Sequence, residues 1–378
     1  SALPERTMRD EAIDFLCDLE GPVTIFKTLK AIKGGEEDFS DIPSLWWRDG
    51  DRVVRPTSAE PILTDLDNEM PGIAWDLLPM DKYRAHNWHS FDHIHDRSPY
   101  AAIHTSLGCP YKCNFCCINS PFGKSSYRMW SPESVIKEID YLVENYGVKN
   151  LKFVDEMFVL NKNHVMGICD LLKSRDYEMN IWAYARVDSV QDEFLDNLKA
   201  AGVNWLCLGI ESASDHVRDG ADKIYGNDDI KDVVHRIQGA GIYIIGNYIF
   251  GLPDDSVERM QGTLDLALEL SCEFANFYSA MAYPGSPLYD QAMAQNIPLP
   301  DMWKDFSQHG YNAKPLANQF CSAAEILEFR DNAFDTYFSH QPYLDMVRDK
   351  FGQDVVDHLN RMAAIPLRRK LLEDSNAA

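Results

Sequence analysis

The chain has 378 residues, of which 45% are hydrophobic and 25% are charged, and this balance is typical of a folded protein with one large core. Its net charge of −23 repels phosphate backbones and no run of Lys or Arg offsets it, so we expect a small-molecule or protein substrate and no nucleic acid. No apolar stretch is long enough to span a membrane and no export signal is visible, so we expect a cytoplasmic protein without a membrane span.

The first 95 residues are expected to form an N-terminal region with a helix, a hairpin and a linker. Apolar residues indicate a helix over 11–29. A hairpin is expected over 45–54, because Asp49-Gly50 supplies the positive φ angles that a tight turn needs. The Pro-rich segment 56–79 is expected to be a linker. Three aromatic residues are expected to pack this region onto the mouth of the barrel that follows: Trp46, Trp47 and Trp88.

From Tyr100 onward, six short β-rich runs alternate with helical patterns, which indicates repeated βα units and a parallel sheet. Strands are expected at 101–106, 150–154, 180–185, 205–210, 243–250 and 273–280. Helices are expected at 132–146, with Ser131 as the N-cap, and at 163–175, 191–201, 228–240 and 256–270. Gly202 and Gly241 are expected to end two of these helices. Six units predict an α/β fold class, a partial (β/α)6 open parallel barrel over 96–290.

Strand patterns stop after residue 287, and helical patterns such as the one over 323–338 follow. Residues 291–378 are therefore expected to form a small, mostly helical C-terminal appendage. The predicted organisation has three parts: 1–95, 96–290 and 291–378.

Four of the nine cysteines lie between Cys109 and Cys117, directly after the first expected barrel strand. The C-terminal end of a strand is where barrel enzymes place their chemistry. The spacing of Cys109, Cys113 and Cys116 suits a [4Fe-4S] cluster that binds three thiolates and keeps one iron open to a substrate or cofactor. Zinc is disfavoured, because it usually takes four protein ligands and the adjacent side chains of Cys116 and Cys117 diverge.

The other cysteines and a group of histidines are given no chemical role. Cys117 is expected to be a packed thiol or a group beside the cluster. Five further cysteines are expected to pack in the core as small hydrophobic residues: Cys17, Cys169, Cys207, Cys272 and Cys321. Four histidines have an irregular spacing that favours a linker or a substrate-facing loop over a metal site: His86, His89, His93 and His95.

The motif Cys109-x-x-x-Cys113-x-Phe115-Cys116 resembles the hallmark of the radical S-adenosylmethionine (SAM) superfamily. The resemblance implies that SAM chelates the open iron and that an electron from the reduced cluster releases a 5′-deoxyadenosyl radical. A reductant such as flavodoxin or ferredoxin would supply the electron. The radical would abstract hydrogen from a small organic substrate, with C-methylation or rearrangement as outcomes, and no residue is assigned as catalytic.

Further matches to the superfamily lie at successive expected strand ends, and with Phe115 they make up the cofactor-binding candidates. The resemblance implies that Asp155 or Glu156 accepts a hydrogen bond from the SAM ammonium and that Arg186 pairs with the SAM carboxylate. Glu211 and Ser212 would contact the ribose or the methionyl group. The segment 249–253 resembles the motif near adenine, although the turn that follows departs from the Gly-Glu-Thr-like turn common in the family.

Residues outside the barrel resemble the cobalamin-dependent radical SAM subfamily. Residues 2–7, the helix and hairpin, and residues 75–79 look like the segment that joins a cobalamin-binding domain to the barrel. That domain is not seen before Ser1, so the chain is either a fragment or processed form, or a member without the domain. Cobalamin stays an open cofactor. The alternative functions are a cobalamin-dependent methyltransferase fragment and a non-catalytic iron–sulfur electron carrier or redox sensor.

Overall fold

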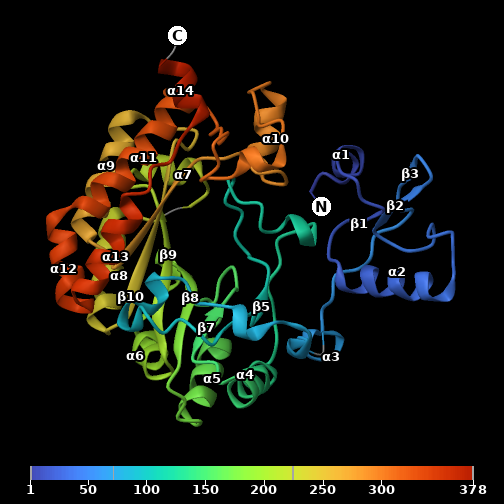
Figure 1. Cartoon of the computed structure of the whole chain (residues 1–378), viewed down its shortest axis with the longest axis horizontal. Helices are drawn as coiled ribbons and strands as arrows, with labels where there is room; N and C mark the ends of the chain where they lie inside the picture. Colours follow the sequence, from blue (N-terminus) through green and yellow to red (C-terminus); the bar gives the residue numbers. More distant parts are fainter. Residues whose placement is uncertain (1, 71, 224, 377–378) are drawn as a thin grey trace.

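The centre of the protein is a curved sheet of six parallel strands, seen in a computed structural model that describes residues 2–70, 72–223 and 225–376 (Figure 1). Across the sheet the strands follow chain order, and the sheet stays open between the first and the last. They are β4 (Tyr100–Ile103), β7 (Asn150–Phe153), β8 (Asn180–Arg186), β9 (Val203–Glu211), β10 (Tyr243–Phe250) and β11 (Phe274–Ser279). The predicted α/β class with an open six-stranded parallel barrel is confirmed.

Helices connect successive strands and cover the outer face of the sheet. They are α4 (Pro132–Tyr146), α5 (Lys162–Lys173), α6 (Asp192–Ala200), α8 (Asn227–Gly239) and α9 (Val257–Leu270). The Ser131 side chain caps α4 by accepting a hydrogen bond from the Ser134 N–H, as predicted. Gly202 and Gly241 follow α6 and α8 with φ of 88° and 74°, a backbone conformation that favours glycine. A short helix between β9 and α8 was not predicted: α7 (Asp215–Gly220).

The first barrel strand is shorter than predicted, because the chain turns out of the sheet after Ile103. The Thr105 N–H donates to the Asp155 carboxylate at 2.6 Å instead of to a neighbouring strand. The next residues form β5 (Ser106–Leu107), which pairs antiparallel with β6 (Arg128–Met129). The single strand predicted over 101–106 is therefore wrong in its second half, and the cysteine loop follows β5.

The N-terminal region forms a small three-stranded antiparallel sheet with two helices beside the barrel (Figure 1). The elements are α1 (Pro4–Asp10), β1 (Phe15–Cys17), α2 (Pro22–Gly34), β2 (Leu45–Asp49) and β3 (Arg52–Val54). The hairpin at 45–54 is confirmed, with Gly50 at a φ of 57°. The helix predicted over 11–29 is wrong: Leu16 lies in a strand opposite Trp46, and the helix starts only at Pro22, which suits a first helical position.

The segment between the hairpin and the barrel contains only short helical turns, and it closes the bottom of the barrel. These turns are α3 (Leu66–Glu69), η1 (Trp75–Leu77), η2 (Met80–Lys82) and η3 (Trp88–His93). The Trp88 ring packs against Trp182 and Trp205, with centroids 4.9 and 5.7 Å away. Both partners lie near the starts of their strands, so the prediction that Trp88 packs at the mouth is wrong. Trp46 and Trp47 pack within the N-terminal region.

The C-terminal residues form helices that pack against the end of the sheet near β11 (Figure 1). Two short elements lie between β11 and the remaining helices: α10 (Pro287–Ala294) and η6 (Trp303–Phe306). The remaining helices are α11 (Ala323–Ser339), α12 (Gln341–Phe351), α13 (Gln353–Ala363) and α14 (Lys370–Asn376). Tyr337, Tyr343 and Val355 are part of the barrel's hydrophobic core. In the part of the chain that the structure describes, no helix is long and apolar enough to cross a membrane.

Candidate metal and cofactor site at the barrel mouth

The cysteine loop lies at the carboxyl end of the barrel and is held by contacts within the loop. Gly108 has a φ of 84°, and a Cβ placed there would lie 2.5 Å from the Ser126 carbonyl oxygen, so the loop requires glycine at its start. The Cys109 N–H donates to Asn119 Oδ1 at 3.2 Å, and the Cys116 N–H donates to the Cys113 carbonyl at 3.1 Å. Two short helical turns flank the mouth: η4 (Ser120–Phe122) and η5 (Val187–Ser189).

Contacts to two other elements hold the middle of the loop over the mouth. Asn114 Nδ2 donates to the Gly220 carbonyl of α7 at 2.6 Å, and the Leu288 N–H of α10 donates to the Asn114 carbonyl at 2.9 Å. The loop therefore depends on α7, which the sequence did not predict, and on the first helix beyond the barrel.

The thiols of the loop differ from the other cysteines in exposure. Cys109, Cys113 and Cys117 are half-buried and Cys116 is exposed, whereas four of the five cysteines expected in the core are buried and Cys17 is half-buried. In the ranges that the structure describes, no three His, Cys, Asp or Glu side chains lie close enough to hold one metal ion. A four-iron cluster binds each thiolate to a different iron, so the donor set and its spacing fit a cluster better than a single zinc ion.

Arg186, the last residue of β8, lies directly beside the cysteine loop. Its Nη1 is 3.5 Å from Cys113 Sγ, and its guanidinium carbon is 3.8 Å from the centroid of the Tyr111 ring. Its other two nitrogens donate to both carboxylate oxygens of Asp188 at 2.8 and 3.0 Å. Arg186 is thus held by Asp188 at the edge of the loop, with one guanidinium nitrogen facing Cys113.

The structure separates the two acidic residues that the sequence left as alternatives. Asp155 is fully buried and accepts hydrogen bonds from the Thr105 N–H, the Thr105 hydroxyl and the Ser106 hydroxyl at 2.5–2.6 Å. Burial raises the pKa of Asp155 to about 6. Glu156 is half-buried and accepts a hydrogen bond from the Gly108 N–H at 3.0 Å, at the start of the cysteine loop. Glu156 is thus the acidic residue that lies at the mouth.

Glu211 and Ser212 at the end of β9 have different surroundings. Glu211 has a φ of 66° and forms an ion pair with Lys223, a residue that the sequence analysis did not single out. Burial lowers and the nearby Glu211 carboxylate raises the pKa of Lys223, and the net shift is upward. Ser212 is fully buried, with its Oγ 3.2 Å from Thr263 Oγ1. The Ser212 hydroxyl therefore bonds within the fold.

A cavity of about 220 Å³ lies next to the cysteine loop. Its walls bring Phe115 of the cysteine motif next to Ile249 of β10, as expected if the two contact one ligand. The remaining wall comes from β11 and the residues that follow it: Tyr278, Ser279, Ala280, Met281, Tyr283 and Gln308. Apolar side chains on opposite sides make this cavity suitable for a flat ring.

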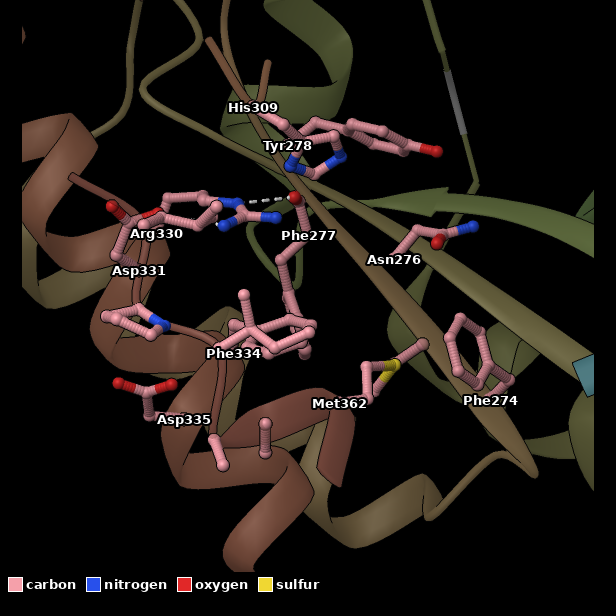
Figure 2. Close-up of a pocket in the computed structure, with 16 residues that line it drawn as sticks. Phe274, Asn276, Phe277, Tyr278, His309, Arg330, Asp331, Phe334, Asp335 and Met362 are labelled. Atoms are coloured by element: carbon pink, nitrogen blue, oxygen red, sulfur yellow. Dashed lines mark hydrogen bonds and ion pairs between the residues drawn. The ribbon is translucent and has the colours of Figure 1, made fainter. Parts of the chain in front are cut away.

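A second cavity, of about 640 Å³, lies on the other side of β11, toward α11 and α13 (Figure 2). Its buried Arg330 donates to the Phe277 carbonyl at 2.8 Å and forms an ion pair with Asp331. Asp331 in turn pairs with Arg369. Arg330 and Asp331 of this cavity are therefore paired within the fold, and none of its lining residues belongs to the cysteine loop.

Comparisons with known proteins agree with the geometry of this site. The model of the radical SAM superfamily matches residues 103–267. An uncharacterized methyltransferase of Pyrococcus horikoshii is 32% identical over 305 residues, which are 80% of this chain and 63% of that protein. An anaerobic magnesium-protoporphyrin IX monomethyl ester cyclase of Cereibacter sphaeroides is 26% identical over 341 residues, 88% of this chain and 53% of that protein.

Among solved structures, the radical SAM methyltransferase TsrM of Kitasatospora setae, with cobalamin and a [4Fe-4S] cluster bound, shares the fold. The TM-score is 0.62 at 20% sequence identity, over 87% of this chain and 62% of that one. The chain spans between about half and two thirds of the length of each of these relatives.

Proposed function

Because the chain contains a radical SAM domain, we propose that it cleaves SAM reductively at a [4Fe-4S] cluster and uses the resulting radical on a small organic substrate. When bound, the cluster and SAM would supply a 5′-deoxyadenosyl radical that abstracts hydrogen. The observation that supports this most directly is the loop of Cys109, Cys113 and Cys116 at the barrel mouth, with Arg186 3.5 Å from Cys113.

In this proposal the three cysteines of the motif hold the cluster, and Cys117 does not. Arg186 pairs with the SAM carboxylate through Nη1, the nitrogen that Asp188 does not engage, and Glu156 accepts a hydrogen bond from the SAM ammonium. The cavity between Phe115 and Ile249 takes the adenine ring. Asp155 and Ser212 act as supports, because the fold already uses their polar atoms.

Glu211, which the sequence analysis placed against the ribose or the methionyl group of SAM, has a second contact within the protein. Its carboxylate is paired with Lys223, so we assign it to holding Lys223 and the loop around it at the mouth, with contact to the SAM ribose as its second role.

The division of the chain into residues 1–95, 96–290 and 291–378 also stays a proposal. A reductant such as flavodoxin or ferredoxin would deliver the electron to the cluster.

We further propose that the reaction is a methyl transfer to carbon that uses cobalamin. Similar proteins are named methyltransferases, and the solved relative binds cobalamin together with its cluster. This part of the proposal depends on similarity to proteins of which this chain spans only part, and it is tested separately below.

The test is anaerobic reconstitution with iron and sulfide, followed by reduction with dithionite in the presence of SAM. We expect 5′-deoxyadenosine from the wild type and none from Cys113→Ala. With methylcobalamin and a substrate, S-adenosylhomocysteine as a second product would support methyl transfer, and its absence would leave radical cleavage alone. An intact cluster that never cleaves SAM would contradict the proposal and favour an electron carrier.

A further inference from the structure

The inner face of the half-barrel carries several half-buried polar residues beside the buried rings of Trp182 and Trp205. Along β7, β10 and β11, half-buried residues alternate with buried ones. The half-buried polar residues used below are Lys152 of β7, Tyr184 of β8, Asn247 of β10, and Asn276 and Tyr278 of β11. Successive side chains of a strand point to opposite faces, so these residues share the face opposite the helices. Figure 2 shows Asn276 and Tyr278 on the side of β11 away from Phe277.

Lys152 is a cation on this face without an anionic partner. Its Nζ lies 4.3 Å from the ring centroid of Trp182 and 5.5 Å from that of Tyr184. In the described ranges no carboxylate forms an ion pair with it, whereas Arg186 pairs with Asp188 and Lys223 pairs with Glu211. Aromatic rings stabilise an ammonium only in part, and a half-buried charge loses hydration.

The other titratable groups around Lys152 do not balance its charge. Burial lowers the pKa of His86 and of His104, and the Lys152 charge lowers both further, so these imidazoles are neutral at pH 7. Burial of Cys207 raises its pKa to about 12, so this thiol is neutral as well. Burial lowers the pKa of Lys152 itself, which is the direction that a bound anion would reverse.

Some polar atoms further along the inner face bond to the protein, and two tyrosine hydroxyls there do not. Asn276 Nδ2 donates to Asn247 Oδ1 at 2.9 Å, and Asn247 Nδ2 donates to Cys207 Sγ at 3.0 Å. Within the described part of the chain, the hydroxyls of Tyr184 and Tyr278 make no hydrogen bond to the protein. Half-buried donors and acceptors that the fold does not satisfy are typical of ligand sites.

The position of Lys152 relative to the cysteine loop follows from the register of the strands. Lys152 is level with Trp182, and Arg186 lies four residues further along the same strand, which is about 13 Å at the usual rise of a β-strand. Lys152 therefore lies near the strand starts, at what we call the floor of the barrel, and Arg186 beside Cys113 lies at the carboxyl ends of the strands. A molecule bound between them has one end at the cation and the other near the cluster loop.

We infer that the barrel interior binds a substrate that carries a carboxylate, that Lys152 receives this carboxylate at the floor, and that Tyr184, Asn276 and Tyr278 bind polar atoms along its length. This inference rests on the proposed function for the site at the mouth. A single ammonium suits a singly charged carboxylate, whereas a phosphate usually engages several cations or an Arg fork. The rings of Trp182 and Tyr184 provide an apolar wall beside the charge.

The test uses the reconstituted protein with its cluster and, as probes, acetate, benzoate and 2-naphthoate, each compared with its neutral amide by titration calorimetry. A charge-assisted contact makes an acid bind roughly ten- to a hundredfold more tightly than its amide. We expect this for at least one acid, and we expect Lys152→Met to remove the preference. Lys149→Met, an exposed lysine three residues away, should keep it.

Three results would overturn the inference: no acid binds better than its amide, Lys152→Met keeps the preference, or Lys149→Met removes it equally. Thermal unfolding of Lys152→Met shows whether the lysine is structural, because loss of an unpaired charge should leave the midpoint as high as in the wild type. Binding needs no SAM cleavage, so failure of the proposed function and failure of this inference give different results.

Discussion

The outer and inner faces of the six-stranded sheet differ in what their polar and charged groups are bonded to. On the outer side, the guanidinium of Arg330 in α11 donates to the Phe277 carbonyl and pairs with Asp331. On the inner side, Lys152 lies over the rings of Trp182 and Tyr184, and no carboxylate in the described part of the chain forms an ion pair with it. In our proposals the outer face stabilises the fold, and the inner face and mouth bind ligands. Substitutions on the two faces should affect different measurements.

The largest expected effect is at the mouth, where Cys113→Ala should lose most of the iron and sulfide while Cys117→Ala keeps the full content. Only the three cysteines of the motif would bind iron, and a barrel with its own hydrophobic core should fold without the cluster. Iron analysis after anaerobic reconstitution measures the loss, and circular dichroism checks the fold. Equal loss in both variants, or an unfolded Cys113→Ala protein, would contradict this view of the mouth.

On the outer face, Phe277→Ala should lower the free energy of unfolding by about 3–5 kcal/mol, because it removes a buried ring from the core. Phe277 is buried and its ring lies 5.5 Å from that of Tyr337. Tyr278→Phe is the matched variant on the inner face, and it removes only a hydroxyl that makes no hydrogen bond within the described residues. It should change the free energy of unfolding by less than about 0.5 kcal/mol. Denaturant unfolding of both variants tests the contrast, which similar losses would refute.

The buried carboxyl group of Asp155 should make the stability of the protein depend on pH. Burial raises its pKa to about 6, above the ordinary 3.8, so its contribution to stability is complete below pH 3.8 and is lost as the pH rises through 6. Asp155→Asn should remove this pH-dependent loss of unfolding free energy, which amounts to as much as roughly 3 kcal/mol at neutral pH. Unfolding from pH 5 to 7.5 should show the wild type weakening relative to the variant. A constant difference would mean that Asp155 stays ionised throughout.

The smallest effect concerns Arg186, whose loss should weaken SAM binding without changing stability or iron content. Replacing one charge-assisted hydrogen bond costs roughly ten- to a hundredfold in affinity, so Arg186→Ala should bind SAM that much more weakly. Arg175 makes the same forked contact with Asp140 away from the mouth, at 2.7 and 2.9 Å, and Arg175→Ala is the matched control. Wild-type affinity in Arg186→Ala would show that another residue holds the carboxylate.

Elements whose signals lie within a few neighbouring residues were predicted well. The Ser131 cap and Pro132 mark the start of α4, and β10 occupies the predicted range 243–250. The predictions failed where a partner distant in sequence decided the conformation. Leu16 is in a strand because Trp46 pairs with it, and the first barrel strand ends early because Asp155 binds the Thr105 N–H. Lys152 was overlooked, although its alternation with Leu151 and Phe153 places it on the inner face.

The sequence by itself determined the barrel class and the cysteine loop, because caps, strand alternation and the spacing of Cys109, Cys113 and Cys116 depend on neighbouring residues. Only the tertiary structure distinguished Glu156 from Asp155 at the mouth and brought Arg186 to Cys113, which is 73 positions away in the chain. The assembled strands also pair Glu211 with Lys223, and among the described residues they bring no carboxylate into an ion pair with Lys152. The sequence gives the charge of each side chain, but the packing of the strands decides which group it pairs with.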